Sequence, residues 1–333
     1  MKKIISLLLC VGLVMTMFTA CGSKGVKTGL AVVTTATSSK DATAESDGLA
    51  QVDSTAVAVL VDSKGVIQNC AIDVIQTRFN FNAAGEITTE LDKTFVSKKE
   101  LGDAYDMRKA SPIGKEWYEQ AEALEKYVIG KTLDQVKGIA IDDHGYVTDE
   151  DLASSVTINI ASIISAIEKA VNNAKDLGAK AGDKLGLGLI SGAQASGTKN
   201  ASAEGDGSVT AYTHYGVITL DKNGKITSSI IDASQSKVFF NAEGKITSDL
   251  TGPFETKIEL GDRYNMRSAS GIGKEWFEQS EAFCNYMKGK KVADITGLAL
   301  DGGKATDKDL VSSVTITITD FLTVVDKAAK VAK

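Results

Sequence analysis

Two short hydroxyl-rich segments of the chain contain the residue types that could carry a phosphate group. They read D-L-A-S-S-V-T at Asp151–Thr157 and D-L-V-S-S-V-T at Asp309–Thr315. A threonine hydroxyl can form a phosphoester, and the free backbone N–H groups at the start of a helix favour an anion. If a helix begins at each segment, its hydroxyl groups lie where a phosphate is best held.

An apolar stripe follows each motif. Steps of three and four residues place its members on one face of a helix that packs on a core. The members are Ile160, Ile163, Ile164, Ile167 and Val171 after the first motif, and Ile318, Phe321, Leu322, Val325 and Ala329 after the second. The stripe predicts a helix N-terminus at each motif. Serine and threonine are also ordinary helix caps, and V-T-I-N-I alternates like a strand end, so a structural role is the alternative for each motif alone.

The two motifs close two copies of one sequence unit. Asn82–Gly85 recurs as Asn241–Gly244, an offset of 244 − 85 = 159, and the same offset assigns Gly29 to Gly188. A one-residue deletion near Gly302 reduces the offset to 158 at the second motif. So long a period predicts a tandem pair of domains rather than a solenoid.

Each copy has the pattern of an antiparallel sheet followed by helices, which predicts an α+β fold. We expect two domains, 27–180 and 185–333, each folding around its own core and joined by the short linker Lys175–Lys184. The expected strands of the first copy are Gly29–Val33, Ala56–Val61, Val66–Arg78 and Glu86–Leu91. A helix is predicted by Trp117, Ala121, Leu124 and Val128, and further strands by Val136–Ile141 and Ile295–Leu300.

The N-terminus has the pattern of an exported lipoprotein. Lys2 and Lys3 precede the apolar run Ile4–Phe18, and Phe18–Cys21 resembles the lipobox of bacterial lipoproteins. The pattern predicts a signal peptide at 1–20, a lipid on Cys21 and a tether at 21–26, with the protein on the extracytoplasmic face of the cell membrane. Loss of the leader removes two lysines and no acids, giving a net charge of 35 − 43 = −8. Such a charge does not favour binding to nucleic acid.

The remaining chemistry-bearing residues do not form a duplicated catalytic centre. Cys70, Cys284, His144 and His214 have no counterparts of the same type in the other copy. No Gly-x-Ser-x-Gly elbow, P-loop or dinucleotide fingerprint occurs in the sequence. We therefore expect neither independent catalysis nor a metal site. The paired aromatic residues Trp117 and Trp276 could stack on a planar ring, although core packing is the commoner role of such side chains.

The motif D-x-x-S-S-V-T resembles the flavin-attachment sequence of the FMN-binding domain family, usually D-x-x-[ST]-G-A-T. The resemblance implies that a separate FMN transferase esterifies the FMN phosphate to Thr157 and Thr315. It also implies a set of recognition and phosphate-side residues. These are Asp151, Ser154 and Ser155 in the first copy, and Asp309, Ser312 and Ser313 in the second. The chain departs from the family pattern where Ser-Val replaces the commoner Gly-Ala.

The family includes flavin-carrying subunits of membrane redox complexes and two-domain flavin lipoproteins of extracellular electron transfer. The lipobox, the tandem copies and the motif positions are similar to the last group. The resemblance implies a lipid-anchored electron carrier, not an enzyme, with two covalent FMN groups. It would take electrons from a membrane NADH or quinone dehydrogenase and pass them to extracellular acceptors. The alternatives are a cofactor-free solute-binding or adhesive surface lipoprotein, and a flavin-dependent reductase of a small molecule.

Overall fold

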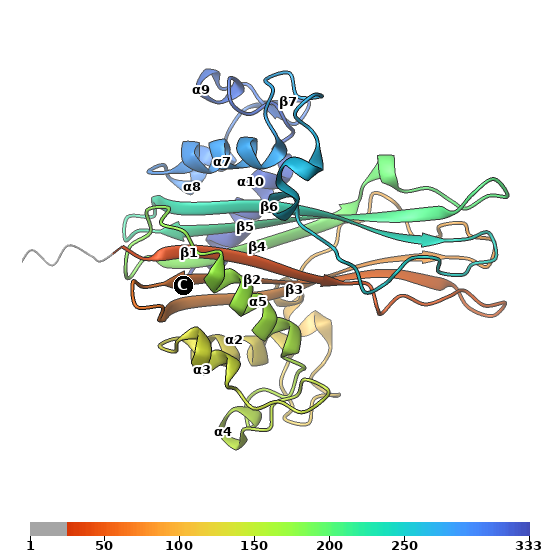
Figure 1. Cartoon of the computed structure of the whole chain (residues 1–333), viewed down its shortest axis with the longest axis horizontal. Coiled ribbons are helices and arrows are strands. Elements are labelled where there is room, and N and C mark those ends of the chain that lie inside the picture. Colours follow the sequence, from red (N-terminus) through yellow and green to blue (C-terminus); the bar gives the residue numbers. More distant parts are fainter. Residues whose placement is uncertain (1–24) are drawn as a thin grey trace, which may run out of the picture.

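The computed structural model describes residues 25–333 as two sheets packed face to face with helices on both outer sides (Figure 1). Each copy contributes one three-stranded antiparallel sheet, in the order β1-β2-β3 for the first and β4-β5-β6 for the second. The predicted α+β class is therefore confirmed. The predicted signal peptide and the lipidation site Cys21 lie outside the described residues.

The elements that the two copies share follow one another in the same order. The strands are β1 (Lys27–Thr35), β2 (Gly48–Val61), β3 (Ile67–Phe81), β4 (Lys184–Ala193), β5 (Gly207–Leu220) and β6 (Ile226–Phe240). The helices of the first copy are α1 (Lys98–Leu101), η1 (Gly102–Tyr105), α2 (Trp117–Val128), α3 (Leu133–Lys137), α4 (Glu150–Ala153) and α5 (Ala161–Asn172). Those of the second are η2 (Ala195–Gly197), α6 (Lys257–Leu260), η3 (Gly261–Tyr264), α7 (Trp276–Met287), α8 (Val292–Thr296), α9 (Lys308–Val311) and α10 (Thr319–Val331), and the hairpin β7 (Leu300–Asp301) and β8 (Lys304–Ala305) precedes α9.

The central strands are buried on both faces, which explains their nearly continuous apolar sequence. In β2, Ala58 and Leu60 point toward the opposite sheet, whereas Val57 and Val59 point toward the helices of their own copy. Successive side chains of a strand alternate between its faces, so one strand serves two cores.

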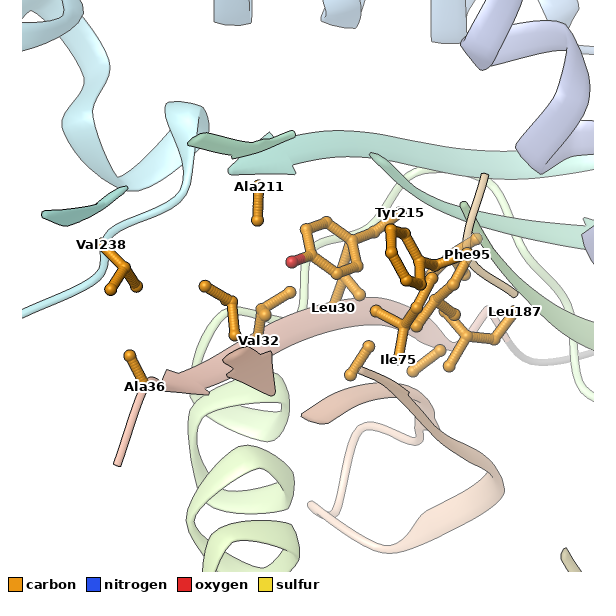
Figure 2. Packing of buried hydrophobic residues seen from close by; sticks show 14 of the residues in the cluster. Leu30, Val32, Ala36, Ile75, Phe95, Leu187, Ala211, Tyr215 and Val238 are labelled. Atoms are coloured by element: carbon orange, nitrogen blue, oxygen red, sulfur yellow. The ribbon is translucent and has the colours of Figure 1, made fainter. Parts of the chain in front are cut away.

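The structure has one core between the sheets and one outer core in each copy. The outer cores are composed of residues of a single copy, as expected. The inner core combines both copies, and Figure 2 shows Leu30 and Ile75 of the first packed with Leu187 and Tyr215 of the second. The expectation that each copy is a separate bead with a core entirely its own is therefore wrong. An antiparallel sheet with apolar residues on both faces needs cover on both, and here the second copy supplies it.

Reciprocal contacts relate the two copies. The N–H of Ala42 donates to the carbonyl of Gly244 at 2.8 Å, and the N–H of Ala201 donates to the carbonyl of Gly85, also at 2.8 Å. Each member of one pair lies 159 residues from its equivalent in the other. Such exchange of equivalent contacts is typical of a twofold interface between identical subunits, here within one chain.

The strand register corrects one sequence assignment. Gly29 pairs with Val59, and Gly186 pairs with Ile218, the equivalent of Val59. A Cβ atom on Gly29 would lie 2.0 Å from the carbonyl oxygen of Ala170, and one on Gly186 would lie 1.9 Å from that of Ala328. Gly29 is thus the counterpart of Gly186, and not of Gly188. Two extra residues of the second copy fall in the loop containing η2 and restore the 159-residue offset.

Three predicted strands are largely absent from the described structure. Glu86–Leu91 forms no strand, although Ile87 makes an isolated bridge to Phe81. Most of Val136–Ile141 is also not extended, because Val136 lies in α3 with its side chain fully buried, and Ile295 is likewise buried in α8. Short apolar runs do not distinguish a buried helical turn from a strand.

The predicted linker is bound to the first sheet. Lys175 and Thr28 exchange two backbone hydrogen bonds of 2.8 and 3.0 Å, and the N–H of Val26 donates to the carbonyl of Ala179 at 3.2 Å. The segment therefore extends the edge of the first sheet before the second copy begins. None of the helices within residues 25–333 has the length and apolar character needed to cross a membrane.

Candidate functional site

The hydroxyl motif follows a short helix instead of beginning a long one. In the first copy α4 ends at Ala153, and Ser154 and Ser155 continue its last turn through N–H bonds to the carbonyls of Glu150 and Leu152. Helix α5 begins at Ala161, four residues after Thr157. The prediction that the motif forms a helix N-terminus is therefore wrong, and the helix-dipole argument for a phosphate at Thr157 does not apply.

The stripe after Thr157 is helical as predicted, but it begins farther along. Ile160 is the N-cap residue of α5, and the side-chain oxygen of Asn159 accepts from the N–H of Ala161 at 3.0 Å. Asn159, one residue before the N-cap, therefore supplies the side-chain acceptor for the first turn of the helix. Thr157 lies in the connection between α4 and α5.

A buried glutamine fixes the position of Thr157. The Oε1 atom of Gln120, from α2, accepts from the backbone N–H of Thr157 at 2.7 Å, from its Oγ1 at 3.1 Å and from the N–H of Ile158 at 3.2 Å. The amide nitrogen of Gln120 donates to Oγ of Ser111 and to the carbonyl of Lys115, both at 3.2 Å. The glutamine is fully buried. The side-chain amide therefore connects α2 to the motif, and both its oxygen and its nitrogen have hydrogen-bond partners.

The second copy repeats this arrangement. Oε1 of Gln279, from α7, accepts from the N–H of Thr315 at 2.8 Å, from its Oγ1 at 3.3 Å and from the N–H of Ile316 at 3.3 Å. The amide nitrogen of Gln279 donates to Ser270 and Lys274, both at 3.2 Å. Both threonine side chains are partly exposed. The two copies thus present the same hydroxyl in the same setting.

The other motif residues surround the threonines without converging on one point. Asp151, Ser154, Asp309 and Ser312 are exposed, whereas Ser155 and Ser313 are partly buried. Three of the serine hydroxyls donate hydrogen bonds to carbonyls of the helix that they follow. Ser154 donates to the carbonyl of Asp151, and Ser155 and Ser313 donate to the carbonyls of Leu152 and Leu310. These serines therefore close the last turn of α4 and α9.

The chemistry of these residues fits a covalent flavin phosphate at its point of attachment. Thr157 and Thr315 are each partly exposed, and each carries a hydroxyl on a backbone held by a buried amide. The N–H groups of Thr157 and Ile158 are already bound to Gln120, so they are not free to cradle a phosphate. The fit therefore rests on the hydroxyl as an ester-forming group.

One turn from each glutamine, the same helices carry a tryptophan that contacts a lysine. Lys257 lies above the rings of Tyr212, Tyr264 and Trp276, with its Nζ atom 4.4, 4.6 and 5.0 Å from their centroids. In the first copy Lys98 lies 4.7 Å from Tyr105 and 5.3 Å from Trp117. Both tryptophans are buried, which is the core role that their size favours.

The lysine of the second copy is the more enclosed. Its side chain is only 3% exposed, and Nζ donates a hydrogen bond of 2.6 Å to the hydroxyl of Tyr212. Burial lowers the pKa of Lys257 to about 7, because the charged ammonium loses hydration. Tyr212 has Asp53 as its counterpart in the first copy, so the two copies differ in charge at this point.

The sequence patterns did not reveal the bridging role of Gln120 and Gln279, nor the aromatic rings that surround Lys257. Gln120 lies three residues after Trp117 and directly before Ala121, on the buried side of its helix, and Gln279 occupies the equivalent place. A polar residue on an apolar stripe in both copies was a detectable signal. The contacts of Lys257 gave no such signal in the sequence, because Tyr212 and Tyr264 come from separate elements. Within residues 25–333 no group of three histidine, cysteine or acidic side chains is placed to bind a metal ion.

Comparison with known proteins gives one partial relative. A protein described as "Chlorophenol reductase", from Desulfitobacterium hafniense, is 34% identical over 94 residues. The aligned part covers 25% of this chain and 29% of the relative, so the chain matches well under half of that protein. No family profile and no solved structure matches the chain.

Proposed function

We propose that the protein is an extracytoplasmic, lipid-anchored electron carrier that holds two FMN groups as phosphoesters of Thr157 and Thr315. The supporting observation is the duplicated setting of these threonines, each partly exposed and held by a buried glutamine. The resemblance of the motif to a flavin-attachment sequence supports the same residues. The partial relative carries the name of a reductase, which belongs to the same broad redox class.

The protein residues would contribute anchoring and position. A flavin supplies reversible electron transfer, while its protein surroundings set burial and neighbouring charge. Thr157 and Thr315 would provide the ester oxygens, and Gln120 and Gln279 would fix the backbone on which those oxygens lie. A covalent bond retains a cofactor on a protein outside the membrane, where lost FMN is not replaced. The donor would be a membrane dehydrogenase, and an FMN transferase would attach the groups.

The mass of the intact protein tests this proposal. After coexpression with an FMN transferase, the protein should gain two units of FMN less water. Thr157→Ala and Thr315→Ala should each remove one unit, and the double variant should be colourless. Thr148→Ala, which changes an exposed threonine near the first motif, is the matched control and should retain both units. Full loading of the double variant would exclude the assigned residues.

A cofactor-free surface lipoprotein is the second candidate. It is favoured by the hydrogen bonds to Gln120 and Gln279, which give each threonine a structural role without any ligand. In that case the coexpressed protein has the mass of the polypeptide and lipid alone and shows no flavin fluorescence in a denaturing gel.

The membrane anchor has its own test. Cys21→Ser should release the protein from the membrane fraction or leave it as a precursor with the leader attached. The intact mass reports the lipid separately from the flavins. Persistent membrane attachment of the variant would contradict lipidation at Cys21 while leaving the flavin proposal open to its own measurement.

A further inference from the structure

A cavity of about 520 Å³ lies where the first copy meets the second. Its first-copy wall comes from β3, α1 and α2, and its second-copy wall comes mainly from β4 and α10. The volume falls within the range of about 300–1,000 Å³ that is usual for small-molecule sites. Neither Thr157 nor Thr315 lines this cavity, so it is separate from the proposed flavin positions.

The alternation of side chains along β3 directs Asp73 toward the second copy. Successive side chains of a strand point to opposite faces of the sheet. Ile72 and Val74 belong to the outer core of the first copy, whereas Ile75 belongs to the inner core between the sheets. Asp73 shares the face of Ile75, and it lines the cavity together with Leu187 of β4. The strand geometry and the cavity lining thus agree on where this carboxylate points.

One oxygen of this buried carboxylate has no hydrogen-bond partner. Asp73 is 5% exposed, and its Oδ1 atom accepts from the N–H groups of Val74 at 2.8 Å and Lys99 at 3.2 Å. Its Oδ2 atom accepts no hydrogen bond of normal geometry from residues 25–333. The fully enclosed side-chain atoms without a hydrogen bond in that part of the chain are Oε2 of Glu125 and Oγ of Ser236. Oδ2 of Asp73 therefore retains contact with solvent, and since Asp73 lines the cavity, that contact lies in the cavity.

Four lysines line the cavity, and each of them contacts a carboxylate of the chain. The contacts are Lys99–Glu125, Lys327–Glu100 at 2.5 Å, Lys330–Asp326 at 2.6 Å and Lys333–Glu122 at 3.2 Å. Four cations thus face four carboxylates, and Asp73 adds a further negative charge. Burial raises the pKa of Asp73 to about 6, because the ionised group loses hydration, so the group is still mainly ionised at pH 7.

We propose that this cavity binds a small cationic amine with an apolar body. Its ammonium group donates a hydrogen bond to Oδ2 of Asp73, and its hydrocarbon part packs against Leu187 and Leu189 of β4, which line the cavity. An ammonium group supplies both the donor that Oδ2 lacks and the positive charge that balances Asp73. A hydroxyl compound would supply only the donor, and an anion would meet the carboxylate with a like charge.

The second copy keeps the carboxylate but has a bulkier wall. The counterparts of Ala71 and Asp73 are Ile230 and Asp232, and Asp232 is as buried as Asp73. Ala71 lines the cavity. The repeat therefore supplies two informative variants. Ala71→Ile installs, on the wall of the cavity, the side chain that the same fold already holds at Ile230, and Asp232→Asn is the matched control for Asp73→Asn.

Calorimetry with the full-length protein at pH 7 tests the proposal. Phenethylamine, which joins one ring to a primary ammonium group, should bind saturably. Phenethyl alcohol is its neutral hydroxyl analogue, and hydrocinnamate is an anion of similar shape. Each should bind at least about tenfold more weakly, because a hydrogen bond between two charged groups is stronger than one to a neutral group.

Nuclear magnetic resonance locates the bound amine. The amide signals of Val74 and Lys99 should shift with phenethylamine, because their N–H groups donate to the carboxylate that binds it. The amides of Ala233 and Ile258 donate in the same way to the equivalent carboxylate of the second copy, at 2.8 and 3.1 Å. Their signals are the internal control and should stay unchanged.

Variants identify the binding groups. Asp73→Asn keeps an oxygen for the two backbone N–H groups but removes the charge, and it should weaken phenethylamine binding at least about tenfold. Ala71→Ile should weaken binding to a similar degree by occupying space, with no change of charge, and Asp232→Asn should leave the affinity unaltered. No saturable binding, equal affinity for phenethyl alcohol, or undiminished affinity of either Asp73→Asn or Ala71→Ile would each overturn the proposal. None of these measurements requires flavin, so the result is independent of the proposed function.

Discussion

Phe81 stacks on Phe240, its own equivalent in the other copy, with ring centroids 4.2 Å apart and ring planes inclined by 5°. Both rings are fully buried. A residue that meets its own counterpart marks the twofold axis of an isologous interface. The chain is therefore built like a homodimer whose subunits are joined by a short connection.

A single copy should consequently associate with itself. A protein of residues 27–180 exposes the inner face of its sheet, including Leu30, Leu60 and Phe81. We expect it to form a dimer through that face, because an exposed apolar face of this size is unfavourable in water. Size-exclusion chromatography with light scattering measures the mass. Leu91→Asp in the same protein changes an already exposed residue and should leave the dimer intact. A monomer with cooperative unfolding would contradict the shared inner core.

Glycines under the long helices should resist substitution. Gly29→Ala and Gly186→Ala would each place a methyl group about 2 Å from a helix carbonyl oxygen, of Ala170 and Ala328 respectively. We expect each to destabilise the protein by about 1–3 kcal/mol or more, since helix and sheet must separate to relieve the clash. Urea unfolding gives the free energy. Gly271→Ala, at a site with open space, is the control, and an unchanged midpoint for Gly29→Ala would refute the close packing.

The glutamine bridges should stabilise both motifs. Gln120→Leu leaves the N–H groups of Thr157 and Ile158 without their acceptor, and Gln279→Leu does the same to the second copy. A buried donor without a partner costs about 1–3 kcal/mol. Unfolding measurements should show that loss, and hydrogen exchange should accelerate at Thr157 and Ile158. Lys126→Ala, on the exposed side of α2, should change neither. Normal exchange at Thr157 in Gln120→Leu would mean that the bridge does not hold the motif.

Lys257 should make stability depend on pH above neutrality. Its pKa is about 7 in the folded protein against 10.5 in the unfolded chain. Between these values the unfolded state binds the additional proton, so the lysine's contribution to stability rises with pH across that window. Below pH 7 both states are protonated, and the full destabilising effect of the buried charge remains.

Comparison with Lys257→Met isolates this effect. The difference in unfolding free energy, wild type minus variant, should become more positive from pH 7 to about pH 10. Groups that titrate in both proteins cancel in the difference. Lys304→Met removes an exposed lysine of the same copy and should give a flat difference curve. A flat curve for Lys257→Met would show that the ammonium is not desolvated.

The sequence predicted the features that depend on short-range patterns. The apolar stripe of Trp117, Ala121, Leu124 and Val128 gave the correct helix, because helical spacing is a local signal. It could not place α5 relative to Thr157, since the same stripe is compatible with a start at either Thr157 or Ala161. The side chain that accepts a hydrogen bond from the first turn of α5 is Asn159, which the sequence pattern did not single out.

The sequence could not reveal the association of the two copies. Val57 and Ala58 are both apolar, which shows that both faces of β2 are covered but not what covers each one. The cover of Ala58 lies more than a hundred residues away, on the other sheet. For the same reason the neighbours of Lys257 were invisible, because Tyr212 and Trp276 reach it from different layers.

The layered arrangement places the short helices that precede the two threonines, α4 and α9, on opposite outer sides of the molecule. In Figure 1, α9 lies at the top and α4 at the bottom, with the two sheets between them. Stacked sheets are about 10 Å apart and a helix is about 10 Å across, so the sheets and both helical layers put a distance on the order of 30 Å between the threonines. Electrons on two flavins so placed would not pass quickly from one to the other through the protein. Under the proposed function, each flavin would therefore exchange electrons with its own external partner. Electrons would not travel along the protein from one flavin to the other.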